Sequence, residues 1–441
     1  MFARRTLAGA FEALAAISLT LPVGSQENRS VDLSQPASLK QCLDIAAVNH
    51  PRLKETQADV ESARWKVVES KSSLYPSVGL VSNWSRFNSS RQGFSVGSAG
   101  ASENRETAVG VAYEFLDSGQ RANAIRLSTT TAQATEAGLT VARQAIALAV
   151  AQAYFELLAS QDIVALRDQV VASADAHVAS ARAGFEAGTK ARIDILRAET
   201  ELANARVDVI TARGDVRRAQ AALRNSMGLT QEIELQVLQE GPQVSPVSSL
   251  EAARQAAQQR REELRQQELN VKASGLSVKS SEIDAGVAYS LAGSYDQYLD
   301  SSRDTTDEYV LRAALSYPIF DGKSSRSRVK AARADLKAVQ QQLEQQRQAI
   351  LLEVDQAWIT VDDARARVEA AEAAKKQSVE NLALNEFSYR EGVASMVEVI
   401  DARSAAAQAD SNAIRARYDY DLAVCSLRYA MGQTVIEEDR R

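Results

Sequence analysis

The chain has 441 residues, enough for two or three globular domains, but its composition is unusual for such domains. Aromatic residues make up 5% and charged residues 24%, with much alanine, glutamine, arginine and glutamate, which is typical of long helices and coiled coils. The net charge of −6 argues against a nucleic-acid partner. Two cysteines and two histidines are too few for a disulfide scaffold or a metal cluster, and we expect no cofactor.

The cysteines and histidines have ordinary structural interpretations. Cys42 and Cys425 stand far apart in the sequence without a CxxC pattern, so we expect two small packed thiols. We expect His50 and His177 to be surface residues of helices rather than metal ligands.

The first residues have the pattern of an export signal. Arg4 and Arg5 give a positive start, residues 7–21 are mostly apolar, and small residues follow at 23–25. We predict a signal peptide over residues 1–25 and a mature chain that starts near Gln26. The alternative is an anchor helix, although the apolar run is short for a span of ~20 residues. No later segment has the length and apolarity of a transmembrane helix, so a membrane-spanning part would have to be a β-barrel.

Prolines divide the rest of the chain. None of the seven lies between Pro76 and Pro242 or after Pro318, so both stretches permit long helices. Pro242 and Pro246 mark a linker. We predict four segments after the signal peptide, namely a first repeat (26–241), a linker (242–249), a second repeat (250–432) and a tail (433–441).

The two halves repeat one another. Tyr113 and Asp117 match Tyr317 and Asp321 at an offset of 204 residues, and Met227-Gly228 matches Met431-Gly432 at the same offset. Upstream the offset is 211, which leaves the first half about seven extra residues near 82–107. Internal duplication indicates that each half forms the same unit. Its order is helix, two strands, long helix, turn and return helix.

Four short segments have the alternation of half-buried strands. Three contain the alternating residues Val109, Val111, Tyr113 and Phe115; Val287, Tyr289, Leu291 and Tyr295; and Tyr309, Leu311, Leu315, Tyr317 and Ile319. The fourth, near Ser77–Phe87, is less regular. We expect polar turns at Ser89–Ser102 and Asp300–Thr306. This pattern fits tilted membrane strands, and it fits two soluble hairpins equally well.

Four strands are too few for a closed barrel, because about eight is the observed minimum. An open sheet edge cannot lie in lipid. If these strands are membranous, several chains must share one barrel, and three chains would supply twelve strands.

The expected helices differ in length by a factor of two. The long ones, Ser118–Ala187 and Gly322–Glu391, have about 70 residues, or ~105 Å at 1.5 Å per residue. The return helices, about Ile193–Met227 and Val397–Met431, are half as long. Helices near Pro51–Leu74 and Glu262–Glu282 make up most of the missing length. We therefore predict one long helix beside two shorter helices stacked end to end in each half.

The return helices have a regular seam. Ile195, Leu202, Val209, Val216 and Leu223 recur every seven residues, and alanine stands three residues after each of the first four. The second return helix repeats the alanine row at positions 402, 409, 416 and 423. This spacing drives left-handed supercoiling. It fits the wall of a helical cylinder, and also an ordinary two-stranded coiled coil.

Several short motifs together resemble the TolC-like outer-membrane efflux proteins, over roughly Leu39–Gly432. They are Asn49-His50-Pro51, Leu74-Tyr75-Pro76, Phe115-Leu116-Asp117-Ser118-Gly119, Tyr317-Pro318-Ile319-Phe320-Asp321-Gly322, the turns Phe185-Glu186-Ala187-Gly188 and Tyr389-Arg390-Glu391-Gly392, and the closing pattern from Leu223 to Leu229. Their order and duplication make the resemblance specific.

The resemblance implies a mainly helical, trimeric channel-tunnel with membrane strands. A shared twelve-stranded β-barrel would span the outer membrane, surrounded by its lipid, and a coiled-coil α-barrel would reach ~100 Å into the periplasm. It implies no catalytic activity, and we find no nucleotide loop or nucleophile elbow. It implies a passive exit duct that receives cargo from an inner-membrane pump of the RND or ABC type through a periplasmic adaptor (membrane fusion) protein.

The resemblance also implies a gate at the periplasmic tip. The family's acidic pair matches Glu398 and Asp401, whose spacing of three residues puts both carboxylates on one helix face. Its tip tyrosine matches Tyr389, and the acceptor of that tyrosine on the other hairpin matches Asp194. The alternative for these residues is a solvated helix face.

One gate contact of the family is lost. The family's gate arginine falls on Ala394. Lys190 and Arg192 of the neighbouring hairpin are the candidates to replace it. Gly188 and Gly392 are expected at the hairpin turns.

Efflux is the favoured function, and an exit duct for type I protein secretion uses the same fold. A periplasmic adaptor would carry one hairpin and a compact β-rich domain, whereas this chain has two equivalent hairpins. A plain structural coiled coil would not cluster aromatics. Six of the twelve tyrosines lie in the expected strand regions, at positions 113, 289, 295, 298, 309 and 317.

Overall fold

The computed structural model describes residues 36–87, 102–231, 235–239, 249–300 and 305–435, all of them in the unit Pro36–Arg441. The predicted signal peptide lies outside the described residues. So do most of the 242–249 linker and the end of the 433–441 tail.

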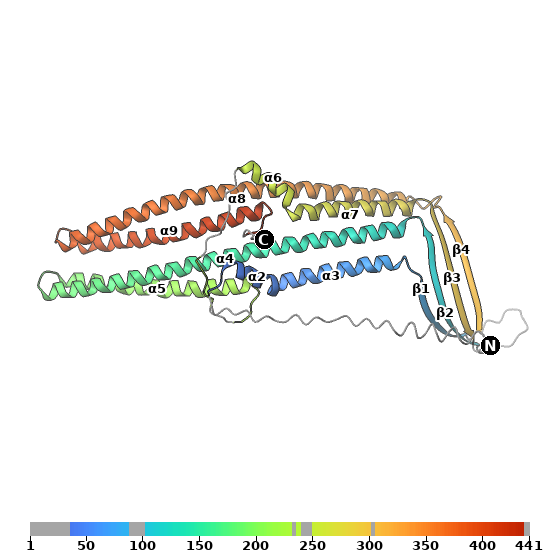
Figure 1. Ribbon diagram of the computed structural model, residues 1–441, viewed down its shortest axis with the longest axis horizontal. Helices are drawn as coiled ribbons and strands as arrows, with labels where there is room; N and C mark the ends of the chain where they lie inside the picture. The colour runs from blue at the N-terminus through green and yellow to red at the C-terminus, as the bar shows by residue number, and fades with distance from the viewer. Residues whose placement is uncertain (1–35, 88–101, 232–234, 240–248, 301–304, 436–441) are drawn as a thin grey trace, which may run out of the picture. The chain divides into compact units, whose positions relative to one another are not determined.

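Each half of the chain has the predicted order of elements (Figure 1). The first half contains α2 (Leu39–Asn49), α3 (Pro51–Ser72), β1 (Ser77–Phe87), β2 (Ser102–Asp117), α4 (Gln120–Glu186) and α5 (Arg192–Ser226). The second contains α6 (Leu250–Arg260), α7 (Glu262–Ala285), β3 (Ala288–Asp300), β4 (Thr305–Ser316), α8 (Ser324–Arg390) and α9 (Met396–Ala430). Both long helices have 67 residues and both return helices 35, and the duplication is confirmed.

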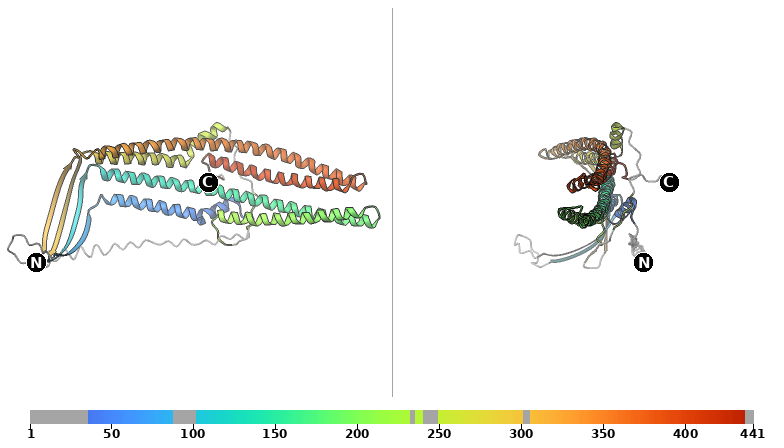
Figure 2. Two further views of the ribbon diagram at one scale, coloured as in Figure 1. Left: turned by 180° about the vertical axis from the view of Figure 1, so that it is seen from behind. Right: turned by 90° about the vertical axis from the view of Figure 1, so that its left-hand side faces the viewer.

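The long helices lie beside shorter helices stacked end to end, as predicted (Figures 1 and 2). α4 packs against α3 and α5, and α8 packs against α7 and α9. α4 also contacts α7 and α9 and so joins the two halves. This leaves α3 and α5 along one lateral edge of the helical layer and α8 along the other.

The seven-residue seam of α5 is its buried face. The buried residues are Ala198, Leu202, Ala205, Val209, Ala212, Ala219 and Leu223. Ion pairs between α4 and α5 flank the seam at the same interval, joining Arg182 to Glu199, Asp175 to Arg206 and Asp168 to Arg213. Such exposed pairs contribute about 0–1 kcal/mol each. The close approach that alanine permits is therefore the main source of packing in this antiparallel pair.

The four strands form one antiparallel sheet in the order β1-β2-β3-β4. β1 and β4 each have one edge without a strand partner in the described part of the chain. The strand β4 ends at Ser316, short of the expected Tyr317 and Ile319. Pro318 explains this difference, because it has no N–H for a ladder and restricts the residue before it.

Two other strand bounds differ from the prediction. β3 begins after Val287 and reaches Asp300, and β2 already begins at Ser102. The strands leave residues 88–101 and 301–304 between them, where the turns were expected at Ser89–Ser102 and Asp300–Thr306. Both segments lie outside the described part.

One window of α4 could cross a membrane by length and composition, with a mean hydropathy of 1.2 over 18 residues. The expectation that no segment after the signal peptide has this character was wrong. The window is 44% buried inside the protein. Because α4 is the helix that joins the two halves, its apolar residues, among them the buried Val150, Tyr154 and Leu158, are accounted for by packing.

Candidate functional site

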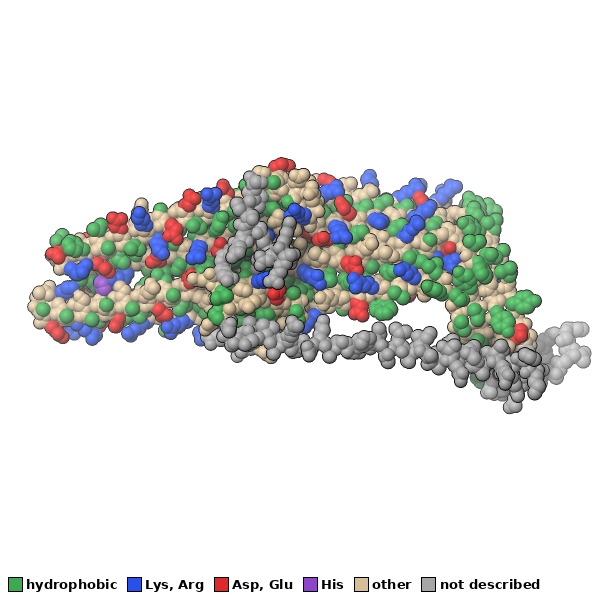
Figure 3. All heavy atoms as spheres, in the orientation of Figure 1, with side chains coloured by type: hydrophobic (Ala, Val, Ile, Leu, Met, Phe, Trp, Pro, Cys, Tyr) green, Lys and Arg blue, Asp and Glu red, His purple; other side chains and the backbone are tan. Residues whose placement is uncertain are grey.

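The sheet carries apolar side chains on one face and polar ones on the other. The register places exposed Val78, Leu80, Trp84, Val109, Val111, Tyr289, Tyr295, Tyr309, Leu311 and Leu315 on one face. It places Ser77, Asn83, Glu114, Ser294, Asp296, Glu308 and Arg312 on the other. Hydrophobic side chains gather over this end of the unit in Figure 3. An apolar exposed face opposite a polar one is the pattern of strands between lipid and an aqueous lumen.

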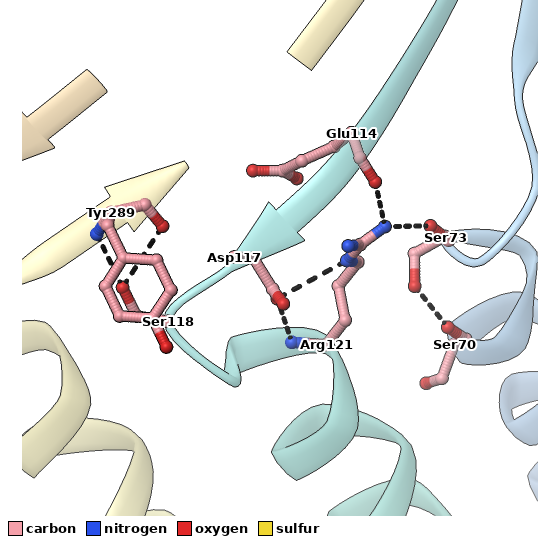
Figure 4. A network of polar contacts seen from close by, with 7 residues as sticks. All are labelled: Ser70, Ser73, Glu114, Asp117, Ser118, Arg121 and Tyr289. Carbon is pink, nitrogen blue, oxygen red and sulfur yellow. Dashed lines mark hydrogen bonds and ion pairs between the residues drawn. The ribbon is translucent and has the colours of Figure 1, made fainter. Parts of the chain in front are cut away.

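One arginine ties the sheet to the helices (Figure 4). The Nη1 atom of Arg121 donates to the backbone carbonyls of Ser73 at 3.0 Å and Glu114 at 2.7 Å. The hydroxyl of Ser118 accepts the backbone N–H of Tyr289 at 2.7 Å. The end of α3 and the strands β2 and β3 are thereby held against the start of α4.

The aspartate of each motif that opens a long helix is a helix cap. Asp117 Oδ2 accepts the backbone N–H of Arg121 at 2.5 Å, and Asp321 Oδ2 accepts that of Ser325 at 2.7 Å. Hydrogen bonds from the side chain and the backbone of Ser325 lower the pKa of Asp321 below its usual value. The matching motifs therefore perform the same task in both halves.

Glycines close the return helices where these meet the short helices. Gly228 and Gly432 have φ of +73° and +71°. A Cβ on Gly228 would lie 2.6 Å from the Cα of His50, and one on Gly432 would lie 2.8 Å from the carbonyl carbon of Arg260. Backbone thus approaches backbone at the α2–α3 and α6–α7 junctions.

The residues at those two junctions differ between the halves. His50 lies between α2 and α3, where its Nδ1 accepts the N–H of Arg52 at 3.2 Å and caps α3. Its counterpart Arg261 is buried and donates to the carbonyl of Tyr429 at 3.2 Å, at the end of α9. Nothing in the local sequence pattern distinguishes Arg261 from its exposed neighbour Arg260.

Both hairpin turns have the same backbone. Gly188 and Gly392 have φ of +73° and +76°, and their N–H groups donate to Phe185 and Tyr389 at 2.9 and 3.2 Å. A Cβ would meet no atom within 4 Å at either position. The left-handed backbone alone therefore accounts for glycine here.

The predicted acidic pair lies in the first turns of α9 and is exposed. The Glu398 carboxylate accepts the backbone N–H of Ser395 at 2.7 Å, and the Ser395 hydroxyl accepts that of Glu398 at 3.4 Å. This capping box gives Glu398 a local role in starting α9. A place for Glu398 and Asp401 in a pore requires neighbouring chains and stays a prediction.

Tyr389 contacts the other hairpin through Lys190. The Lys190 Nζ atom lies 3.9 Å from the centre of the Tyr389 ring, and the lysine stem folds over Gly184. The Tyr389 hydroxyl is buried without a hydrogen-bond partner among the described residues. Asp194 lies 4.0 Å from Arg197 of its own helix. The Tyr389–Asp194 pair is thus not formed within this chain and stays a prediction.

Lys190 and Arg192, the two candidates for the gate cation that the resemblance places at Ala394, differ in their contacts. Lys190 reaches across to the second hairpin, as described. Arg192 is exposed and has no ion pair in the part of the chain that the structure describes.

A charged cluster missed by the sequence analysis joins the hairpins further from the turns. It comprises His177 (α4), Glu201 (α5), Glu386 (α8) and Arg403 (α9), and we name it the hairpin cluster. Arg403, with 6% of its side chain exposed, lies 3.3 Å from the Glu201 carboxylate and 2.7 Å from that of Glu386. Its Nη2 also contacts the His177 Nε2, which lies 3.6 Å from Glu386.

The prediction that His177 is a surface residue was therefore wrong, since its side chain is only 19% exposed. Burial, and next the Arg403 guanidinium, lower the pKa of His177. Burial raises the pKa of Glu201 against the effect of Arg403. Apolar Ala174, Val178, Leu202 and Met396 pack together in the same hairpins. In this arrangement a neutral imidazole accepts a hydrogen bond from Arg403.

No group of three or more histidine, cysteine or acidic residues suited to a metal ion occurs among the described residues. Cys42 and Cys425 are free and buried, as expected of packed thiols, and burial raises the pKa of each to about 12.

Comparisons with known proteins agree with this geometry. A sequence profile described as "Outer membrane efflux protein" matches residues 42–229 and 253–433. The outer membrane protein TolC of Vibrio cholerae is 25% identical over 426 residues, 91% of this chain and 92% of the relative. Protein CyaE of Bordetella pertussis is 28% identical over 416 residues, 90% of this chain and 83% of the relative. A crystal structure of CusC has the same fold, with a TM-score of 0.79, 17% identity, and coverage of 90% of this chain and 92% of that one.

Proposed function

This chain belongs to the outer membrane efflux protein family, and we propose that three copies form the exit duct of a tripartite efflux system. It is a non-enzymatic outer-membrane channel that extends into the periplasm. Channels of this family form trimers within efflux systems. The partners that we propose are a periplasmic adaptor and an inner-membrane pump of the RND or ABC type.

The four-stranded sheet is the main observation that supports an assembly of several copies. It has an exposed apolar face, and neither outer edge has a partner within the described chain. An open edge in lipid would leave backbone groups without hydrogen bonds, at a cost of several kcal/mol each. Strands from further copies satisfy these edges when the sheet closes into a barrel.

The hairpins form the periplasmic tip in this proposal. Their turns lie at Gly188 and Gly392, and Tyr389 and Asp194 belong to the gate region. Glu398 and Asp401 line the constriction when three chains meet. The repeats over 26–241 and 250–432, joined by the 242–249 linker, supply the two hairpins of each protomer.

The exit duct of a type I protein-secretion system is the second candidate. The similarity to protein CyaE over 90% of this chain favours it. Copurification distinguishes the two candidates, because crosslinked partners would be a drug or metal pump in one case and a protein exporter in the other.

The trimer is tested by the mass of the detergent-extracted protein. We expect about three times the 47.7 kDa of one full-length chain, less the predicted signal peptides. A folded, monodisperse monomer in light scattering would contradict the proposed trimer.

The intact mass of the exported chain tests the predicted mature start near Gln26.

Adjacent residues of β4 test the lipid face. Leu311 lies on the apolar face and Val310 on the polar face. A lysine on the lipid face near the bilayer midplane costs roughly 2–4 kcal/mol. We expect Leu311→Lys to lower the yield of membrane-inserted trimer and Val310→Lys to leave it near wild type. Equal yields would contradict the assignment of the faces.

A further inference from the structure

We propose that the hairpin cluster is a proton-sensitive latch, in which protonation of His177 loosens the contact between the two hairpins and favours opening of the tip. The proposal rests on the proposed function, since it assumes a channel whose tip opens. It adds a regulatory signal, the pH of the solution at the hairpin tips.

We call the state with the two hairpins in contact, as in this structure, the joined state, and the state with that contact broken the parted state. In the joined state the geometry makes His177 a hydrogen-bond acceptor. Its Nε2 faces the Arg403 Nη2, which can only donate, so that nitrogen must be unprotonated. Protonation would remove the acceptor and place an imidazolium against a buried guanidinium. Low exposure of both side chains strengthens this repulsion, because little water screens it.

Every helix packed around His177 contributes a charge. Arg403 on α9 and Lys190 ahead of α5 oppose protonation, whereas Glu386 on α8 favours it. Glu201 on α5 pairs with Arg403 from the other side. A protonated imidazole would also compete with Arg403 for the Glu386 carboxylate, which already lies 3.6 Å from Nε2. The repulsion weakens the contact by which Arg403 connects α9 to His177 of the first hairpin. It opposes the attraction between an imidazolium and Glu386, which lies on the second hairpin, and burial and Arg403 outweigh that attraction in the joined state.

The direction of the pH effect follows from linkage. The pKa of His177 is lowered when the hairpins are joined and returns toward its ordinary ~6.5 when they part. Protons therefore bind preferentially to the parted state, and acidification through ~6.5 favours opening. Glu201 acts with the opposite sign, because its pKa is raised in the joined state. Since an ordinary glutamate titrates near ~4.3, we expect its effect to be largest at lower pH than that of His177.

The experiment uses single-channel recordings of the reconstituted protein in a planar bilayer. The chamber facing the tips is taken from pH 7.5 to pH 5.5. At pH 5.5 an imidazole of ordinary pKa is about nine-tenths protonated, so the open-to-closed ratio should rise by up to about tenfold per protomer. The variant Glu201→Gln should retain this rise.

Three variants isolate the imidazole. His177→Gln keeps an uncharged acceptor for Arg403 and should abolish the pH response. His177→Lys carries a charge at both pH values and should be open more often already at pH 7.5. His50→Asn is the matched control, because His50 is the only other histidine of the chain and asparagine preserves a cap for α3. It should respond as the wild type does.

The outcomes separate the inference from the function on which it rests. Channel steps at pH 7.5 in wild type and variants establish the pore. A pore whose opening does not change between pH 7.5 and 5.5 would overturn the latch, and so would a His177→Gln variant that responds like wild type. Absence of pores at every pH would refute the proposed function itself.

Discussion

At the scale of single residues, a cation of the first hairpin contacts an aromatic ring of the second. The resemblance implies that Ala394 of the second hairpin stands where the family has its gate arginine. Lys190, from the first hairpin, instead places its ammonium over the face of Tyr389. The negative face of the ring attracts the cation, an interaction of about 0.5–1 kcal/mol when exposed and ~2 kcal/mol when desolvated. The tyrosine hydroxyl has no hydrogen-bond partner among the described residues and contributes nothing to this contact.

Substitutions at this contact should therefore affect channel opening differently. Lys190→Ala should raise the open-to-closed ratio roughly two- to fivefold per contact, the equivalent of about 0.5–1 kcal/mol. Lys190→Arg keeps the cation and should change little, and Tyr389→Phe keeps the ring and should also change little. Bilayer recordings at constant pH measure the ratio. If Tyr389→Phe and Asp194→Ala open the channel while Lys190→Ala does not, a Tyr389–Asp194 pair holds the hairpins instead.

At the scale of elements, the ends of helices determine how the pieces join. The long helices begin at an aspartate cap in both halves. The return helices end at glycines that lie against the backbone of the junction between the two short helices of the same half. These contacts explain why the short motifs occur twice, since each half must make the same two joints.

Two glycines with the same backbone angle allow the cost of a left-handed backbone to be measured separately from the cost of a steric clash with a neighbouring backbone. Gly188 and Gly228 both have φ of +73°, but of the two only Gly228 has backbone atoms within 3.0 Å of the position that a Cβ would take. Gly188→Ala should cost about 1–2 kcal/mol, the cost of a left-handed backbone. Gly228→Ala should cost clearly more, because His50 or the end of α5 must move. Thermal unfolding of the purified variants measures both, and equal losses would show that the joint is not tight.

At the scale of the whole molecule, both lateral edges of the helical layer expose apolar side chains that other copies of the chain can cover. Exposed Trp65 and Val68 lie on α3 at one lateral edge, and exposed Leu352 and Ile359 lie on α8 at the other. Two different edges that meet head to tail generate a closed ring, as the trimers of this family require. In that ring we expect the first turns of α9 from three chains to converge.

The acidic pair is the prediction that depends most on this assembly. Six carboxylates in one narrow ring should attract cations, so the channel should be cation-selective and blocked by polyvalent cations from the tip side. Glu398→Gln with Asp401→Asn should abolish high-affinity block and weaken the selectivity, each single change having a partial effect. Reversal potentials and block by trivalent ions measure this.

The choice of glutamine matters for Glu398. An alanine would also remove the acceptor of the capping box and disturb the start of α9. Glutamine keeps an acceptor for the Ser395 N–H while removing the charge. Wild-type block and selectivity in the amide double variant would mean that these residues lie on a solvated helix face rather than in the pore.

The architecture of the repeated unit could be predicted from the amino-acid sequence. Seven-residue periodicity, alternation in the strands, the spacing of prolines and the offset of 204 residues are all properties of neighbouring or regularly spaced positions. Helices and strands follow such local patterns because their periods are 3.6 and 2 residues. The four strands, the two long helices and the stacked short ones were predictable for this reason.

The side chains that meet across the hairpins could not be predicted in this way, because their contacts depend on how the helices pack. Arg403 meets Glu201 and His177, about 200 residues away in the sequence, and Lys190 meets Tyr389 at a similar separation. Arg403, Glu201, His177 and Tyr389 have ordinary places in their own helical patterns, and Lys190 lies in the turn ahead of α5. Which residues become partners depends on the packing of α4 against α9, because this packing determines how far each helix is rotated about its axis and shifted along it. A local pattern carries no information about that packing, so the buried charges had to be found in the structure.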